Sequence, residues 1–560
     1  MILAFEFTYL AHNGVLENLL KQSCLESGIK HLITREDTRV ILYVEESEER
    51  LGAFADVLSA SLPLSLFFKS SSVYVAESFP TQDESIPLLN IPLAFTPKKI
   101  TSIETQSSPL YLLPYSEFNV ASDTLSLFKE GEKILEASSS ESFEDIYALL
   151  TTALCEGKTV QVKTASGLFV LGRIEKSKLL PSMKNVEVLP TDLSVVERMV
   201  VIRENEIKAL ATLERPSIRC KVNAMFAQKE ILPTSRVLVR LADEWLVYHL
   251  CRRLFNQGVL FLFKAPATLL KADMCVLTSL NLPVVEPLQV SVLENGEIVL
   301  VKGKSYASKT LLENTKKFEE PSHGAFASIM QEHHLFDAKS SCFYLSKFYD
   351  DKLMNYSSEH GMLNLTSVPL PSSFEALFGE IAQNSESSAR LIENYKNTYP
   401  EIYAQALHVK IPETLPKSVY SLWKIIAVVL GFTSDFDNGA EVLIELAEDF
   451  GGQKGPRMDY FLQKEDALIS DMNYIKLIRS GMSFKLAGTD DATLSFGYVQ
   501  SLAHFISDMS DYYKENLLNE KIALAGSLFG FRRFTEMVYK NLKPNHPICL
   551  NRELPIELNV

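Results

Sequence analysis

Six short segments, each with the periodicity of a strand or of a helix, fill the first 80 residues of this 560-residue chain. A repeat of two residues predicts a strand, and a repeat of 3.6 residues predicts an amphipathic helix. The predicted strands are Ile2–Tyr9, Ile29–Ile33, Val40–Val44 and Ser72–Glu77, and the predicted helices are Gly14–Ser27 and Glu48–Leu62. The order strand-helix-strand-strand-helix-strand is that of a split-βαβ, ferredoxin-like domain. We therefore expect residues 1–80 to form a small domain of this type.

The remaining residues are too many for one core, and their pattern changes twice. Periodicity is lost over residues 81–120 while proline, serine and threonine accumulate, which predicts a linker. Helices and β-branched strands alternate over residues 121–287, which predicts an α/β domain with a mixed sheet. Residues 288–560 open with a hairpin that turns at Asn295-Gly296 and continue with mostly helical periodicity. The clearest predicted helices of the two regions are Ser142–Cys155, Ser194–Val200, Trp245–Phe255, Ser418–Leu430, Ala440–Phe450, Ala492–Glu515 and Phe531–Asn541.

Charge and cysteine usage narrow the class of protein. Acidic residues outnumber basic residues by 70 to 55, and the resulting net charge of −15 disfavours a nucleic-acid binder, because phosphate affinity depends on lysine and arginine. No run of 18 or more apolar residues occurs, so we expect no membrane span. The N-terminus lacks a basic region followed by a cleavage site, and the seven cysteines contain no C-x-x-C pair. These features predict a cytoplasmic protein without a disulfide framework or a zinc knuckle.

Residue chemistry alone offers one well-placed anion site. Gly526-Ser527 follows the predicted strand Lys521–Leu524 and precedes a predicted helix, whose first N–H groups would be free to bind an anion. The alternative is that Gly526 only permits close packing. The stretch from His323 to His333-His334 lacks the H-x-x-x-H spacing of a metal site, so capping or solvated histidines are the simpler interpretation.

Three segments of the last region resemble a known family. The first comprises Ile522-Ala-Leu-Ala-Gly-Ser-Leu-Phe529, Phe534-Thr-Glu and Asn551-Arg-Glu-Leu-Pro-Ile-Glu557, and it resembles the VALSGGVFQN ending of HypF, the carbamoyltransferase of NiFe-hydrogenase maturation. The second, Ser421-Leu-Trp-Lys-Ile-Ile-Ala-Val-Val-Leu-Gly431, is similar to that family's GRLFDAVAALLG. The third, Gly324-Ala-Phe-Ala-Ser-Ile-Met-Gln-Glu-His333, is similar to its HAHIASVMAEH.

Further resemblances precede these in the family's order. Glu156-Gly-Lys-Thr-Val-Gln-Val-Lys163 resembles the start of the family's YrdC-like domain, Glu214-Arg-Pro-Ser-Ile218 resembles its ERPIVLL, and Leu277-Thr-Ser-Leu-Asn281 resembles its MTSGN. The resemblance covers most of the chain and implies a multidomain α/β protein. Its implied parts are an acylphosphatase-like domain over 1–80, a linker over 81–120, a YrdC-like domain over 121–287 and an actin-like, TsaD-like domain over 288–560.

The resemblance also implies a chemistry, its sites and its partners. HypF moves a carbamoyl group from carbamoyl phosphate through an adenylate to a cysteine thiolate, so ATP and a divalent metal are the implied cofactors, provided that the ancestral activity is retained. The nucleotide or anion contacts that it implies fall on Gly526, Ser527, Lys163, Thr278, Ser279 and Asn281. The implied partners are other hydrogenase maturation proteins.

Departures from the family's motifs predict weakened or lost catalysis. The acylphosphatase-like loop reads His12-Asn-Gly-Val-Leu-Glu-Asn18, without the phosphate-binding arginine, and residues 81–120 lack the cysteines of the family's zinc fingers. The metal pair of the HHHAH motif falls on Pro321 and Ala325, which leaves His323 and Glu557 as its remnants. A metal needs three or more convergent donors, so we expect no resident metal.

The phosphate-binding motifs of the last domain are altered as well. The glycine-rich DGTGYG becomes Ser346-Lys-Phe-Tyr-Asp350, whose side chains obstruct the approach of a phosphate to backbone amides. The nucleotide-contacting asparagine of GGVFQN becomes Phe531. Two hypotheses follow: a diverged carbamoyltransferase, or a non-catalytic scaffold or regulator that binds maturation partners.

Overall fold

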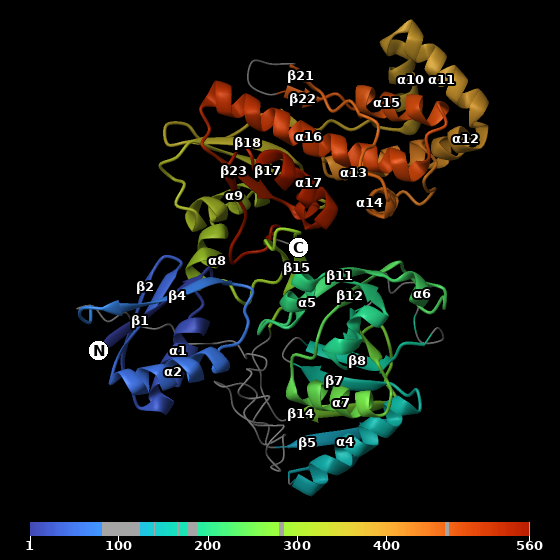
Figure 1. Ribbon diagram of the computed structural model, residues 1–560. Helices are drawn as coiled ribbons and strands as arrows, with labels where there is room; N and C mark the ends of the chain where they lie inside the picture. The colour runs from blue at the N-terminus through green and yellow to red at the C-terminus, as the bar shows by residue number, and fades with distance from the viewer. Residues whose placement is uncertain are drawn as a thin grey trace. The chain divides into compact units, whose positions relative to one another are not determined.

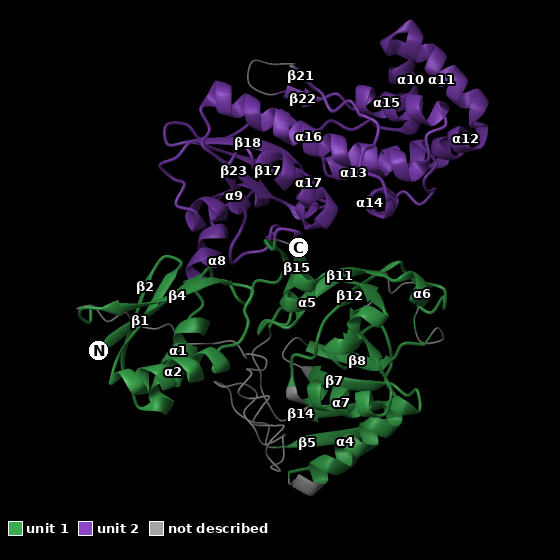
Figure 2. Ribbon diagram, viewed as in Figure 1, with its two compact units in different colours: residues 1–292, 296–308 green, residues 293–295, 309–560 purple. Residues whose placement is uncertain are grey.

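The computed structural model describes residues 1–80, 124–138, 140–164, 167–175, 179, 187–278, 285–464 and 470–558. Contacts divide the chain into two compact units, shown in Figure 2. Unit 1 comprises Met1–Val292 and Gly296–Ser308, and unit 2 comprises Leu293–Asn295 and Lys309–Val560. The predicted linker over 81–120 lies outside the described residues. Within the described parts, no helix has the length and apolar character needed to cross a membrane.

The six elements predicted for the first 80 residues are confirmed (Figure 1). They are β1 (Ile2–Tyr9), α1 (Val15–Ser27), β2 (Lys30–Glu36), β3 (Arg39–Glu45), α2 (Glu48–Ser61) and β4 (Phe68–Ala76). The strands form an antiparallel sheet in the order β2-β3-β1-β4, in which β1 pairs with both β3 and β4. Phe5 and Phe7 of β1 are buried with Leu20 of α1 and Phe54 of α2, so the alternation along β1 positions both helices on one face.

The rest of unit 1 is built on one mixed sheet, as the alternating pattern predicted. Its strands are β5 (Leu125–Lys129), β6 (Glu132–Ala137), β7 (Val160–Thr164), β8 (Gly167–Arg173), β9 (Glu187–Pro190), β10 (Val200–Val201), β11 (Ser217–Val222), β12 (Arg236–Val239), β13 (Phe261–Pro266), β14 (Met274–Thr278), β15 (Gln289–Val292) and β16 (Ile298–Lys302). The main path runs β16-β15-β11-β12-β9-β13-β8-β7-β14-β5-β6, and β10 pairs with β11.

The helices of this region are α4 (Ser140–Cys155), α5 (Glu204–Leu210), α6 (Ala224–Ala227) and α7 (Trp245–Asn256). Phe143 and Leu150 of α4 and Leu254 of α7 are buried in one cluster with Val160 and Val276 of the sheet. The predicted helix Ser194–Val200 is wrong in type. The chain instead forms a 3-10 helix over Leu193–Arg198 and then enters β10, because the Asp192 carboxylate caps the first turn while the valines that follow pair with β11.

The hairpin with its turn at Asn295-Gly296 is confirmed, but its strands belong to the sheet of unit 1. Strand β15 pairs in parallel with β11, with Ser217 opposite Gln289 and Ile218 opposite Val290. The contact boundary therefore falls after Ser308, whereas the sequence pattern predicts a division at 287/288. The names and limits of the domains stay predictions.

Unit 2 combines a five-stranded sheet and a smaller three-stranded sheet with many helices, as the helical periodicity predicted. Its helices are α8 (Lys309–Thr315), α9 (Pro321–Glu332), α10 (Phe374–Asn384), α11 (Glu386–Thr398), α12 (Pro400–His408), α13 (Val419–Val429), α14 (Gly439–Asp449), α15 (Tyr474–Leu486), α16 (Asp491–Leu517) and α17 (Arg532–Leu542), with a 3-10 turn at Ser527–Gly530. Its strands are β17 (Ser340–Tyr344), β18 (Lys352–Ser357), β19 (Gly361–Asn364), β20 (Thr366–Ser367), β21 (Leu462–Lys464), β22 (Ser470–Met472), β23 (Lys521–Ala525) and β24 (Ile548–Cys549).

The larger sheet of unit 2 has the order β19-β18-β17-β23-β24. Strand β17 pairs in parallel with β23, so that Tyr344 lies opposite Ala525 and the two strands end at the same edge of the sheet. This edge carries Gly526-Ser527 on one strand and Leu345-Ser346 on the other. In open α/β sheets, the carboxyl edge of parallel strands is where ligands bind.

Candidate functional site

The turn that follows β23 is closed by packing. Gly526 has a φ of +94°, which an L side chain rarely adopts, and a Cβ at this position would lie 2.6 Å from the carbonyl carbon of Leu345. The Gly526 N–H donates to the carbonyl of Ile556 at 2.7 Å. Gly526 therefore allows the ends of β17 and β23 to touch, which supports the packing interpretation of this glycine.

The donors at the turn are used by a side chain of the same unit. Glu557 is buried, and its Oε2 accepts from Ser346 Oγ at 2.6 Å and from the Ser527 N–H at 3.2 Å. Its Oε1 accepts from the Tyr344 hydroxyl. Burial raises the pKa of Glu557, and these donors oppose the shift. The carboxylate of Glu557 thus occupies the position that the sequence predicts for a bound anion.

A second buried carboxylate lies next to the first. Asp351 Oδ1 accepts from the Ser346 N–H and Oδ2 accepts from the Val419 N–H, both at 2.7 Å. Burial raises the pKa of Asp351, and the nearby Glu557 raises it further. We call Tyr344, Ser346, Asp351, Ser527 and Glu557 the carboxylate cluster.

The segment in place of the family's phosphate loop is also held internally. Ser346 Oγ accepts from the N–H groups of Phe348 and Tyr349, and the Lys347 N–H donates to Ser527 Oγ at 2.9 Å. The Lys347 ammonium forms an ion pair with Glu441 at 2.6 Å and lies 4.1 Å from the centre of the Phe531 ring. The backbone amides and the one cation of this loop therefore have protein partners.

The two predicted remnants of a metal site, His323 and Glu557, contact different residues. His323 lies in the first turn of α9, with Nε2 3.7 Å from Glu320 Oε2, and no hydrogen bond joins it to Glu557 in the described structure. Among the described residues, no group of three or more histidine, cysteine or acidic side chains could hold a metal ion. Because the donors at the turn hold Glu557, the residues present do not fit a nucleotide phosphate with its divalent metal.

The predicted contacts of the middle region are described only in part. Lys163 is half-buried on β7, and β7 pairs in parallel with β14, with Val162 opposite Val276. The backbones of Lys163 and Thr278 are therefore close to each other at one edge of the sheet. Ser279 and Asn281 lie outside the described residues.

Sequence reasoning missed a group of ion pairs in the same sheet, in which two buried cations meet two half-buried carboxylates. The Arg240 guanidinium donates to the Arg215 carbonyl at 2.8 Å and pairs with Asp243 at 2.6 Å, and Lys264 pairs with Glu187 at 3.3 Å. These cations hold the pKa of Asp243 below its usual value against the effect of burial. We call Glu187, Arg240, Asp243 and Lys264 the ion-pair cluster. Strand β9 lies between β12 and β13 in the sheet although it precedes both of them in sequence, so no short motif indicates the cluster.

The N-terminal loop that lacks the family's arginine is held by neutral contacts of Asn13 and by an ion pair of Glu17. Asn13 Nδ2 donates to the Tyr306 carbonyl at 3.1 Å, and Asn13 Oδ1 accepts from the Val15 N–H at 3.0 Å. The nearby Arg35 pairs with the buried Glu17 at 2.6 Å. The described loop therefore has no arginine of its own, and the neighbouring guanidinium already pairs with a carboxylate.

Comparison with known proteins relates the chain to one fold. No family model matches the sequence. Protein HydE of Wolinella succinogenes is 26% identical over 571 residues, which cover 98% of this chain and 97% of HydE. The structure of full-length HypF in its phosphate- and nucleotide-bound form matches with a TM-score of 0.64 and 13% identity, over 99% of this chain and 96% of that one.

The structure of HypF from T. kodakarensis matches with a TM-score of 0.68 and 11% identity, again over 99% of this chain and 96% of that one. Identities this low establish a shared fold and leave activity to be argued from the residues. The chain therefore has the fold of HypF along its whole length, in agreement with the resemblance of its motifs.

Proposed function

We propose that this protein is a HypF-like component of NiFe-hydrogenase maturation that has lost carbamoyl transfer and acts in the cytoplasm as a scaffold or regulator for partner maturation proteins. The observation that carries the proposal is the internal occupation of the turn at Ser527 by Glu557. A carboxylate that accepts three hydrogen bonds in a buried position excludes a phosphate from the same donors, because both anions cannot share one dry site.

The second candidate is a diverged carbamoyltransferase. The match to HypF over the whole chain favours it, since a scaffold would have no need to keep both units. It requires ATP to bind against Ser346 and Ser527. The Glu557 carboxylate would then have to leave donors that stabilise it, and the Lys347 ammonium would have to leave Glu441.

Titration of the full chain with ATP and Mg²⁺ separates the two candidates. We expect no saturable binding at the turn and no release of pyrophosphate from ATP in the presence of carbamoyl phosphate. Release that is catalysed by the parent protein and lost in Ser346→Ala would establish the enzyme and overturn the proposal. Exposed Ser387, substituted by alanine, is the matched control.

The maturation part of the proposal needs a separate test in cells. Deletion of the gene should lower hydrogenase activity, and the parent gene should restore it. Restoration by Glu557→Gln, which keeps a hydrogen-bonding group of the same size but cannot ionise, would support a role that needs no chemistry at the turn. Unchanged hydrogenase activity after deletion would contradict a role in maturation.

A further inference from the structure

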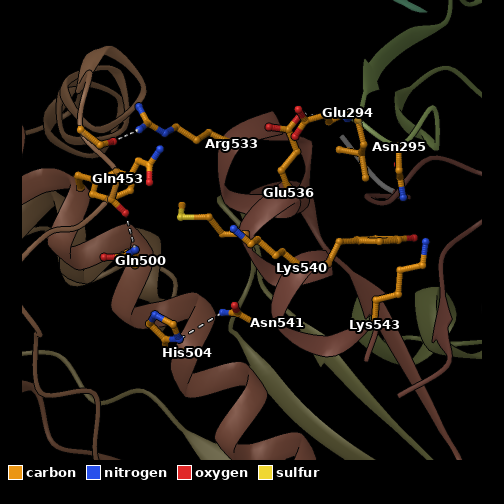
Figure 3. A pocket seen from close by; sticks show the side chains of 15 residues that line it. Glu294, Asn295, Gln453, Gln500, His504, Arg533, Glu536, Lys540, Asn541 and Lys543 are labelled. Atoms are coloured by element: carbon orange, nitrogen blue, oxygen red, sulfur yellow. Dashed lines mark hydrogen bonds between the residues drawn. The ribbon is translucent and has the colours of Figure 1, made fainter. Parts of the chain in front are cut away.

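A cavity of about 810 Å³ along α17 in unit 2 does not bring charges of one sign together (Figure 3). Lys540 and Lys543 are exposed and point to different sides of the cavity, and the exposed Glu294 lines the same space. The Arg533 guanidinium already donates to four backbone carbonyls. A clearer binding feature lies in unit 1, at the outer edge of β4.

The sheet of residues 1–80 has two edge strands that differ in charge. Its order is β2-β3-β1-β4, so β2 and β4 are the edges. Strand β2 carries Lys30, His31, Arg35 and Glu36, and charged groups on an edge discourage pairing with another chain. In the nine residues of β4, Lys69 is the one charged side chain. The edge at β4 therefore lacks the charges that protect the edge at β2.

Strand β4 is exposed on both of its faces. Val73 and Val75 lie opposite Phe5 and Leu3 of β1, yet the two valines are 56% and 65% exposed. Tyr74, which points to the other face, is 39% exposed. Folded proteins seldom leave a long apolar edge uncovered, because its unpaired N–H and C=O groups are a template for another strand.

The described residues that follow β4 turn away from this edge. The Phe79 ring lies against Lys30 of β2, with 4.8 Å between the ring centre and Nζ. Because β2 is the opposite edge of the sheet, residues 77–80 lead away from the outer side of β4. Among the described residues, β1 is the only strand that pairs with β4.

The charges at the two ends of β4 suit a second copy of the same strand. In an antiparallel pair centred on Val73, Lys69 of one copy faces Glu77 of the other, because both residues are four positions from Val73. Lys69 and Glu77 are both exposed. Lys69 also pairs with Glu297 at 3.0 Å, and an ammonium group with three donors can hold two carboxylates. A two-fold axis at Val73 therefore produces an opposite-charge pair at each end of the strand pair.

We propose that two copies of this chain associate through β4, so that their four-stranded sheets join into one sheet across a two-fold axis at Val73. In this register Val73 faces Val73 of the second copy, and cross-strand pairs of β-branched residues stabilise a sheet. The outward N–H and C=O groups of β4 gain partners, which removes the exposed edge. This association is independent of the proposed function.

Sedimentation equilibrium of the full chain at rising protein concentration tests the association. We expect the average mass to rise from that of one chain toward twice that value. Val73→Lys places two ammonium groups opposite each other at the axis and should weaken association about tenfold or more. Val57→Lys makes the same change at another exposed valine, on α2, and should leave association within about twofold of the parent.

Cross-linking tests the register with a smaller substitution. Under mild oxidation Val73→Cys should form a covalent dimer, because residues directly opposite each other have Cβ atoms about 4.5–5.5 Å apart. Val75→Cys lies on the same face but two positions from the axis in each copy, so it should not cross-link. The parent, whose seven cysteines are free, is the control for the native thiols.

Four results would overturn this proposal: a parent that stays monomeric at every concentration, unchanged association in Val73→Lys, equal weakening by Val57→Lys, or equal cross-linking by Val75→Cys. Slow hydrogen exchange of the β4 amides in a monomeric parent would assign the edge to another segment of the same chain. None of these variants changes the turn at Ser527, so a failure here leaves the titration with ATP as the test of the proposed function.

Discussion

The ion-pair cluster of unit 1 and the carboxylate cluster of unit 2 hold their acidic groups in opposite ways. Asp243 and Glu187 lie beside Arg240 and Lys264, and the pKa of Asp243 is lowered. Glu557 accepts only from hydroxyl and backbone donors, and its pKa is raised by burial. In the first arrangement the cations lower the pKa of the carboxyl group, whereas in the second burial raises the pKa against the hydrogen bonds of neutral donors.

This difference indicates which of the two clusters has charged groups that could bind an anion. Cations that hold a carboxylate in the ionised state are groups that could bind an anionic substrate if that carboxylate moved. The neutral donors that surround Glu557 provide no positive charge for a phosphate. The acidic groups beside the altered motifs of the last region are therefore held by hydrogen bonds and not by ion pairs.

The largest effect should come from removing one partner of the ion-pair cluster. Arg240→Met leaves the half-buried Asp243 without its buried guanidinium, and loss of one member of a buried pair costs about 3–5 kcal/mol. Urea unfolding measures the change. Lys208→Met, which removes the exposed pair with Glu204 on α5, is the control and should cost far less, because solvent screens this pair. Equal costs for the two variants would show that the buried cluster contributes no more than a surface pair.

The next effect concerns the backbone contact beneath the carboxylate cluster. Gly526→Ala places a methyl group against the Leu345 backbone and also requires an unfavourable φ, so we expect a cost of about 2–4 kcal/mol. Gly488→Ala has a similar φ of +84° and no atom within 4 Å of the added Cβ, so it isolates the conformational part, about 1 kcal/mol.

The buried Trp423 reports on unit 2 once Trp245 of unit 1 is replaced by phenylalanine. Its fluorescence should follow urea unfolding in both glycine variants. If Gly526→Ala and Gly488→Ala cost the same, Gly526 is not needed for contact between the strands, and an open anion site at the turn becomes the better interpretation.

The local elements were predictable because neighbouring residues determine them. Periodicity located α1, α2, α13, α14, α16 and α17 to within three residues at each end. Strand β17 was not predicted because Ser340 and Ser341 are polar residues, although both are fully buried between β18 and β23. Burial of a central strand depends on partners 180 residues away in sequence, which a local pattern does not contain.

The sequence named residues of the candidate site but could not indicate the contacts that they make. The strand-to-turn pattern identified Gly526-Ser527, and the resemblance identified Glu557. The contact between Glu557 and Ser346 joins residues 211 positions apart, so the sequence could not indicate that the carboxylate fills the turn. The ion-pair cluster could not be predicted either, because its residues come from strands that are far apart in sequence.

The pH dependence of stability should distinguish a carboxylate that is held by neutral donors from one that is held by cations. Glu332 of α9 accepts from the N–H groups of Arg552 and Glu553 at 2.9 Å, and burial raises its pKa to about 8. A raised folded-state pKa means that the folded chain retains a proton which the unfolded chain releases near 4.5. The stabilisation from Glu332 is therefore complete below pH 4.5 and is lost as the pH rises through about 8.

Glu332→Gln removes this titration, so its stability penalty should shrink between pH 5 and pH 8.5. Asp243→Asn should show no such change in that window, because the lowered pKa of Asp243 confines its titration to acid below its usual range of about 4. Unfolding free energies of both variants and the parent at four pH values provide the measurement. A penalty for Glu332→Gln that grows with pH would mean that Glu332 is ionised in the folded chain.

The smallest effect tests whether the large cost expected for Arg240→Met comes from the charges of the ion-pair cluster or only from its position in unit 1. Asn13 of unit 1 makes two neutral hydrogen bonds, to the Tyr306 carbonyl and from the Val15 N–H. Asn13→Ala leaves these two backbone groups partly exposed to water, so we expect a cost of about 1 kcal/mol, the same at pH 5 and pH 8. Asn18→Ala, which removes one contact with the Gly14 carbonyl in the same loop, should cost less. A cost near that of Arg240→Met would mean that unit 1 depends on all its polar contacts alike, and the distinction between ion-paired and neutral burial would then fail.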